Sequence, residues 1–220
     1  LSVHHPKVNV PVLWWRSVGS THTAFVMETL IDEIASATKQ DPVAYRMALM
    51  VGDKGKRHRA ALQLAVDQSG YGKKQLPAGM HWGVAVHESF ESVVAYVLEA
   101  GVKDGKPQIG AVTAGVHCNF CVNPKTVEAQ VQGSAVMALT TTMPGAAITF
   151  KDGVVEQSNF GDYPVARMTD ALNVAVHIVP SNDPPKGMGE PALPPFAPAL
   201  ANALRRATGK PLREMPFKFA

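Results

Sequence analysis

The sequence predicts an α+β fold in which helices come first and mixed strands and helices follow. Three observations support this prediction. Apolar residues recur at helical spacing early in the chain, β-branched and aromatic runs dominate from residue 82, and a last helical pattern follows a glycine- and proline-rich loop. A stretch with glycines, lysines and a proline separates the two regions. We therefore expect a helical part over residues 1–72 and an α+β part over residues 73–220.

The composition indicates a globular, soluble chain. Its 220 residues are 46% hydrophobic and 18% charged, which is enough to bury a core. The net charge of +3 is scattered, and the short basic run at 54–59 has no interleaved aromatic residues, so we expect no nucleic-acid partner. No apolar run approaches the ~20 residues that span a bilayer. Because the chain opens at Leu1 in a polar, proline-punctuated stretch, we expect it to be part of a longer polypeptide.

The first helix should follow an apolar, extended segment at 10–15, with Ser20 or Thr21 as its N-cap. An apolar stripe at helical spacing predicts its buried face: Met27, Leu30, Ile31, Ile34 and Ala35. The acidic residues lie off this stripe: Glu28, Asp32 and Glu33. Because a helix N-terminus gathers unpaired N–H groups, Arg16 beside it can hold an anionic or oxo ligand. A surface salt bridge is the alternative for Arg16.

Two more helices are predicted before the boundary. Asp41 followed by Pro42 should open one that runs to about Met50, and the other should run from His58 to Ser69. Gly70 is expected to end the latter.

Strands are predicted at 83–87, 92–98 and 109–117, with a hairpin turn at 103–106. We expect His87, Glu88 and Ser89 to lie between strands. Adjacent strand residues point to opposite faces, so these three cannot form a catalytic triad as they stand.

The later elements follow the same reasoning. Asn123 and Pro124 should end a strand and lead into a helix over 125–139, a hairpin should turn at Asp152 and Gly153, and the last strand should cover 174–179. The final helix is predicted from five apolar residues at helical spacing: Phe196, Leu200, Ala203, Leu204 and Ala207.

Cys118 and Cys121 are the two cysteines of the chain and have Cys-x-x-Cys spacing. This spacing is found in redox dithiols and in half of a zinc site, but the sequence offers no second ligand pair. We favour two buried thiols near a strand end.

The loop from Pro185 to Pro195 contains the strongest candidate for chemistry. Gly187 and Gly189 let the backbone approach a ligand, and the prolines stiffen the exit from the turn around Glu190. A glutamate in such a mostly apolar loop is a candidate general base. The alternative is a connector with a solvated glutamate.

The end of the chain carries three stretches that resemble one family: Lys-Gly-Met-Gly-Glu-Pro, Pro-Pro-Phe-Ala-Pro-Ala-Leu-Ala-Asn-Ala-Leu and Ala-Thr-Gly-Lys-Pro-Leu-Arg-Glu-Met-Pro-Phe. They are similar to the C-terminus of the molybdenum hydroxylase large subunit, the family of xanthine dehydrogenase and aldehyde oxidase. Within it, the sequence resembles isoquinoline 1-oxidoreductase beta subunits and membrane-linked aldehyde dehydrogenases. Trp-Trp-Arg-Ser-Val-Gly-Ser at 14–20 resembles the arginine loop beside the molybdenum, and the segment around Gln130 resembles the one that contacts the pterin.

The resemblance implies the C-terminal portion of a molybdopterin-binding region, with Glu190 as catalytic base and no side-chain metal ligand. The cofactor-binding positions that it implies are Arg16, Ser17, Val18, Gly19, Gln130, Gly187, Met188 and Gly189. The implied reaction is oxidative hydroxylation of an aldehyde or an N-heteroaromatic substrate with oxygen from water. The implied cofactor is molybdenum-molybdopterin in its cytosine dinucleotide form.

Further expectations follow from the same resemblance. The partners would be an iron–sulfur subunit with its clusters, a membrane cytochrome subunit with haem, and the remainder of the same large subunit. The location would be the bacterial periplasm or the membrane surface, with the cytoplasm as the alternative. The family's Gly-Gln-Gly loop and glycine-rich Phe motif are absent from the sequence, so we expect them on the remainder or on another chain.

Two other functions compete with this interpretation. The chain can be a non-catalytic structural or assembly domain of such a subunit. It can also be a hydrolase that uses Glu190 with His87 or His177, although the sequence has no nucleophile elbow and no metal-ligand set.

Overall fold

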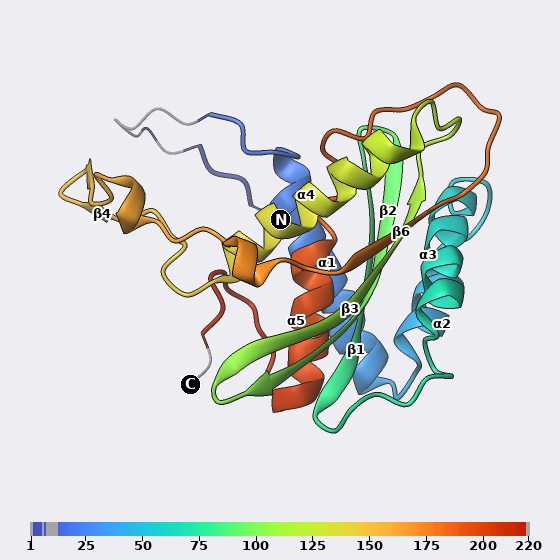
Figure 1. The fold of residues 1–220 in the computed structure, drawn as a ribbon, viewed down its shortest axis with the longest axis horizontal. Helices are drawn as coiled ribbons and strands as arrows, with labels where there is room; N and C mark the ends of the chain where they lie inside the picture. Colours follow the sequence, from blue (N-terminus) through green and yellow to red (C-terminus); the bar gives the residue numbers. More distant parts are fainter. Residues whose placement is uncertain (1, 6, 8–12, 219–220) are drawn as a thin grey trace.

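The computed structural model describes residues 2–5, 7 and 13–218, and its centre is a four-stranded sheet (Figure 1). The strands are β1 (Met80–Ser89), β2 (Ser92–Lys103), β3 (Lys106–His117) and β6 (Val174–Ile178), in the order β1-β2-β3-β6. The first three pair as antiparallel neighbours through short turns, whereas β6 lies parallel to β3 after a long crossover. The fold is therefore α+β, as predicted.

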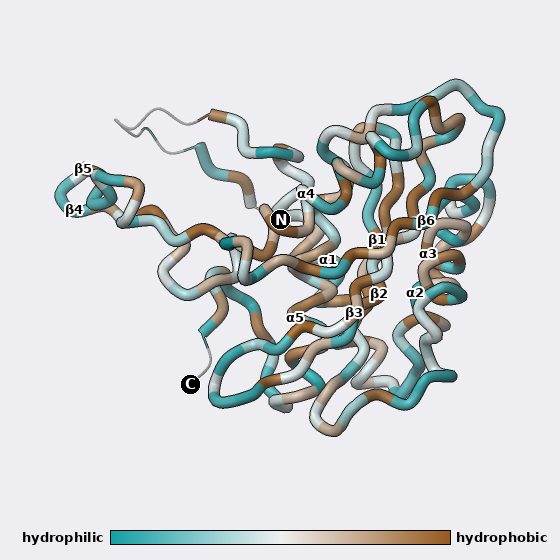
Figure 2. The backbone as a smooth tube through the Cα atoms, viewed as in Figure 1, coloured by the Kyte–Doolittle hydropathy of each residue, from teal (hydrophilic) through white to brown (hydrophobic). Residues whose placement is uncertain are grey.

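Helices cover both faces of this sheet. One face packs against α5 (Phe196–Thr208), which in turn contacts α1 (Gly19–Ala37), and the other face packs against α3 (Lys56–Ser69). The remaining helices are α2 (Pro42–Leu49), beside α1, and α4 (Pro124–Thr142), which contacts α5 and β6. Figure 2 shows hydrophobic residues concentrated along the strands between these layers.

Strand β2 is buried on both sides and separates two cores. On one face of β2, Val94, Tyr96 and Leu98 belong to the core beneath α5. On the other face, Val93, Ala95 and Val97 pack with Leu62 of α3. Successive strand side chains point to opposite faces, so one continuous apolar run serves both cores. Helices α1 and α3 pack on elements that lie beyond residue 73 in the sequence. The division into two parts at residue 72 remains a prediction.

A small hairpin extends away from the sheet. Its strands are β4 (Phe150–Lys151) and β5 (Val154–Val155), and two 3₁₀ turns follow at Phe160–Asp162 and Met168–Asp170. Figure 1 shows this arm reaching well beyond the helical layers. The hairpin turn at Asp152 and Gly153 is confirmed.

Several local signals proved reliable. The Asp41 side chain caps α2 by accepting hydrogen bonds from the N–H groups of Val43 and Ala44 at 2.9 and 2.8 Å. Gly70 and Gly209 end α3 and α5 in the left-handed conformation. The later predicted strands and helices occur close to their expected bounds.

Three expectations require correction or fall outside the described residues. Helix α1 begins at Gly19, so Ser20 and Thr21 lie inside the helix and do not cap it. His87, Glu88 and Ser89 belong to β1, because the ladder with β2 continues to the hairpin turn. Part of the extended segment expected at 10–15 is outside the described residues, and residues 13–15 have no regular structure.

The predicted buried face of α1 is wrong for three of its five residues, whereas Ala35 is buried as predicted and Ile31 is half-buried. Met27, Leu30 and Ile34 are exposed, whereas Glu28 and Asp32 are buried. The physical reason is a buried ion network. Asp32 pairs with three arginines from α2 and α5, at 3.3 Å for Arg46, 3.0 Å for Arg205 and 2.9 Å for Arg206, and Glu28 pairs with Arg46 at 2.7 Å. These bonds compensate the desolvation of the carboxylates.

Among the described residues, no helix is long and apolar enough to cross a bilayer.

Candidate active site

Three segments that are far apart in the sequence meet at Arg16. Its Nε donates a hydrogen bond to the carbonyl oxygen of Gly189 at 2.7 Å, and Nη2 donates to the same oxygen. Nη2 also donates to Oε1 of Gln130, on α4, at 2.7 Å. The guanidinium therefore joins the start of α1, the middle of α4 and the loop before α5.

The next residue binds Glu190. The backbone N–H of Ser17 donates to Oε1 of Glu190 at 2.9 Å, and its Oγ donates to the Glu190 carbonyl oxygen at 2.7 Å. Ser17 is buried and Glu190 is half-buried. One carboxylate oxygen of Glu190 is thus held by a fixed donor, and the described residues offer no hydrogen-bond donor to the other, Oε2.

An unusual backbone turn presents the Ser17 amide to Glu190. Ser17 and Val18 have φ angles of 72° and 47°, in a region that a β-branched residue such as Val18 rarely adopts. Hydrogen bonds hold the turn, because the Val18 N–H donates to the Trp15 carbonyl at 2.8 Å and the Thr21 hydroxyl donates to the Arg16 carbonyl at 2.8 Å. Helix α1 then begins at Gly19.

The loop that carries Glu190 is anchored at several points. The Lys186 N–H donates to the Cys118 carbonyl at 3.0 Å, and the Asn119 side-chain amide donates to the Pro184 carbonyl at 2.9 Å. Met188 is buried in the core beside α5. A Cβ on Gly187 or on Gly189 would meet no atom of the described residues within 4 Å. Both glycines therefore border open space.

The electrostatics of the site keep Arg16 charged. Burial lowers the pKa of Arg16, and the neighbouring Glu190 carboxylate opposes this shift. Arginine titrates so far above neutrality that its side chain remains cationic in proteins. Sequence reasoning did not single out Tyr96, which is fully buried on β2 and packs against Phe196 with ring centroids 5.5 Å apart.

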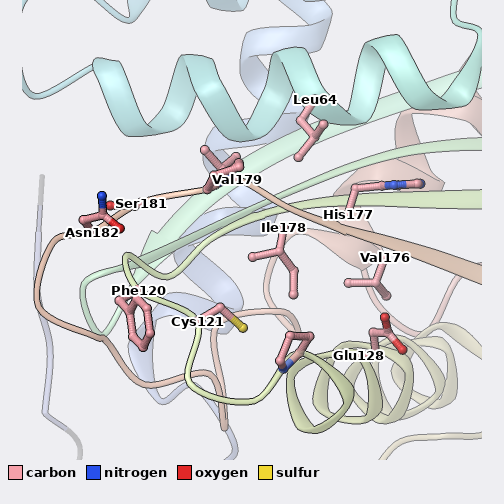
Figure 3. Close-up of a pocket in the computed structure, with 12 residues that line it drawn as sticks. Leu64, Phe120, Cys121, Glu128, Val176, His177, Ile178, Val179, Ser181 and Asn182 are labelled. Atoms are coloured by element: carbon pink, nitrogen blue, oxygen red, sulfur yellow. The ribbon is translucent and has the colours of Figure 1, made fainter.

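The other candidate residues lie elsewhere. His87 is on β1, His177 is on β6, and neither hydrogen-bonds to Glu190 among the described residues. His177 lines a groove of about 510 Å³ along β6, between α3 and α4 (Figure 3). Neither Arg16 nor Glu190 lines that groove. In the described part of the chain, no three His, Cys, Asp or Glu side chains form a potential metal site.

No family model matches the chain, but curated proteins do. It is 29% identical to isoquinoline 1-oxidoreductase subunit beta of Brevundimonas diminuta over 97% of this chain and 27% of that protein. It is 27% identical to the membrane-bound aldehyde dehydrogenase (pyrroloquinoline-quinone) of Gluconacetobacter polyoxogenes over 93% of this chain and 29% of that protein. A third match is the putative xanthine dehydrogenase molybdenum-binding subunit of Escherichia coli K12, with 33% identity over 44% of this chain and 14% of that protein.

The first two matches cover nearly the whole chain, although the chain spans little more than a quarter of either relative's length. The third match is to a subunit that is named for binding molybdenum. In sequence, the chain is similar to a segment of the large subunits of molybdenum hydroxylases.

Proposed function

We propose that the chain forms one wall of a molybdopterin site and supplies the catalytic base, Glu190, of an oxidoreductase that hydroxylates an aldehyde or an N-heteroaromatic substrate. The observation that carries this proposal is the double contact of Ser17 with Glu190 beside the bridge from Arg16 to Gln130 and Gly189. Oxidoreductases named for both substrate classes occur among the relatives.

The available donors suit a pterin cofactor. Nη1 of Arg16 and the amide nitrogen of Gln130 have no hydrogen-bond partner among the described residues. A guanidinium binds anionic or oxo groups, and an amide nitrogen can donate to the polar edge of a pterin. The open space at Gly187 and Gly189 lets such a group approach the backbone. Val18, Gly19 and the backbone of Met188, whose side chain is buried in the core, would complete the wall.

When bound, the molybdenum cofactor would supply the redox chemistry, accepting the electrons that leave the substrate. The role of Glu190 is to accept a proton. The Ser17 N–H occupies its Oε1, so Oε2 is the oxygen that is available to take the proton. The hydrogen bond also fixes the direction of Oε2, and a positioned base typically accelerates a reaction ~10²–10⁴-fold.

The test is a Glu190→Gln variant in the native assembly. We expect molybdenum and pterin contents equal to those of the wild type, with turnover of aldehydes and N-heterocycles reduced by about 10²–10⁴-fold. Glu156→Gln is the matched control, because Glu156 is exposed on the hairpin arm. Unchanged turnover in Glu190→Gln would exclude Glu190 as the base. An assembled complex without molybdenum would favour the structural-domain alternative.

The finer assignments rest on the family resemblance and form part of this proposal. They are the cytosine dinucleotide form of the cofactor, the iron–sulfur and cytochrome partners, and the remainder of the large subunit as the source of the missing glycine-rich motifs. The printed names of two relatives describe subunits, which supports assembly with other chains.

A further inference from the structure

Cys118 and Cys121 have no role in the proposed chemistry, yet they lie side by side. Cys118 follows β3 directly and is 2% exposed, and Cys121 is half-buried just before α4. Both are free thiols, the Cys121 side chain is near enough to raise the pKa of Cys118, and both pack against the same apolar core. The backbone bends between them at Asn119, whose φ of 61° is in the left-handed region.

The two thiols differ in their access to solvent. Cys121 lines the groove of about 510 Å³ along β6, together with Phe120, Glu128 and Ile178 (Figure 3). Cys118 is not part of the groove lining and faces the core. A small reagent in the groove therefore reaches Cys121 first, because Cys118 is buried and lies outside the groove lining.

We propose that Cys118 and Cys121 form a dithiol–disulfide site, in which Cys121 is the attacking thiol and Cys118 the resolving thiol. The co-reactant is a small exogenous disulfide, such as glutathione disulfide. The Cys121 thiolate attacks one sulfur of this disulfide, forming a mixed disulfide and releasing one glutathione thiolate. The Cys118 thiolate then attacks the Cys121 sulfur, closes the intramolecular bridge and releases the second glutathione. The protein loses two electrons and two protons, and glutathione disulfide gains both.

The surroundings of the pair make the second step depend on pH. Burial, and after it the neighbouring Cys121, raises the pKa of Cys118 to about 11. The reactive species is the thiolate, so near neutral pH the closing rate rises roughly tenfold for each pH unit. The bridge would close next to the Glu190 loop, because the Cys118 carbonyl accepts the Lys186 N–H at 3.0 Å.

The experiment uses the full chain, reduced and then incubated in glutathione and glutathione disulfide at several ratios between about pH 7 and 9, where thiolate content changes steeply. Acid-quenched mass spectrometry with peptide mapping follows the products. The chain has two cysteines, so each serine variant retains a single thiol. We expect wild type to close the Cys118–Cys121 bridge faster as the pH rises. Cys118→Ser should accumulate glutathione on Cys121, and Cys121→Ser should react far more slowly.

Two results would overturn the proposal. One is a wild-type chain that remains a dithiol, or stops at the mixed disulfide, at every ratio and pH. The other is a Cys121→Ser variant that reacts as fast as Cys118→Ser. Circular dichroism of the variants shows whether they retain the fold, and the wild-type result stands without them. The readout needs no molybdenum, so its outcome is independent of the role of Glu190.

Discussion

Ser17 contacts Glu190 through two separate groups, its backbone N–H at 2.9 Å and its hydroxyl at 2.7 Å. The first bond orients the Glu190 carboxylate, and the second fixes the Glu190 backbone. The strained turn at Ser17 and Val18 is what aims the N–H at the carboxylate. Backbone strain of this kind occurs where the surrounding structure enforces it, so the turn and the Glu190 loop hold each other in place.

Replacing Ser17 with alanine separates these two bonds. Ser17→Ala removes the hydroxyl and keeps the N–H, so the half-buried Glu190 carbonyl loses one of its two donors and keeps the Leu193 N–H at 3.1 Å, while the carboxylate remains oriented. We expect the free energy of unfolding to fall by about 0.5–1.5 kcal/mol in urea denaturation. Turnover of the assembled enzyme should fall less than in Glu190→Gln. Ser36→Ala, on the exposed side of α1, is the control. Equal stability of the two variants would contradict this account.

Arg16 should require its guanidinium and not only its charge. Arg16→Lys keeps the positive charge but cannot present the planar fork that binds Gly189 and Gln130 at once. We expect the assembled variant to retain less pterin and molybdenum than wild type, measured by metal analysis and pterin fluorescence after gel filtration. Arg213→Lys is the matched control, since Arg213 is exposed and pairs with Glu33. Full cofactor retention by Arg16→Lys would show that charge alone suffices.

The sequence predictions were accurate where a feature is set by residues that are close together in the sequence. The cap at Asp41 and the helix stop at Gly70 are set by a few neighbouring residues, and both were predicted. The contact of Ser17 with Glu190 spans 173 residues and has no local signature. The family resemblance selected both residues, but the hydrogen bonds between them came from the fold.

The buried face of α1 shows why the hydropathy pattern did not predict which side chains of this helix are buried. A periodicity argument assigns acidic residues to solvent because it considers each side chain without its partners. Asp32 is buried because arginines from α2 and α5 surround it, and no window within α1 contains them.

Neutralising Asp32 should be severely destabilising. Asp32→Asn leaves three arginine side chains facing a neutral amide in a site where Asp32 is 0% exposed. Breaking a buried ion pair from one side typically costs about 3–5 kcal/mol of folding free energy, which urea denaturation would measure. Glu33→Gln is the neighbouring control, because its partner Arg213 is at the surface and solvent screens the pair. Similar losses in both variants would contradict a special role for the network.

Stability should also fall in mild acid because of His87. Burial lowers the pKa of His87, the charge of His58 lowers it further, and Glu88 opposes both effects. The unfolded chain, with a histidine pKa of about 6.5, therefore binds more protons than the folded chain just below that pH. The free energy of unfolding should be unaffected by His87 above about pH 6.5 and should decrease as the pH falls toward the folded pKa.

His117 contributes in the same direction, because burial, and after it Arg57, lowers its pKa. We therefore expect His87→Gln to reduce the slope of the unfolding free energy against pH without removing it, as measured by urea denaturation between about pH 5 and 7, where histidines titrate. The double variant with His117→Gln should have a still smaller slope. If the slope of His87→Gln equals that of wild type, the folded and unfolded pKa values of His87 are the same, and burial on β1 does not disfavour its charged form.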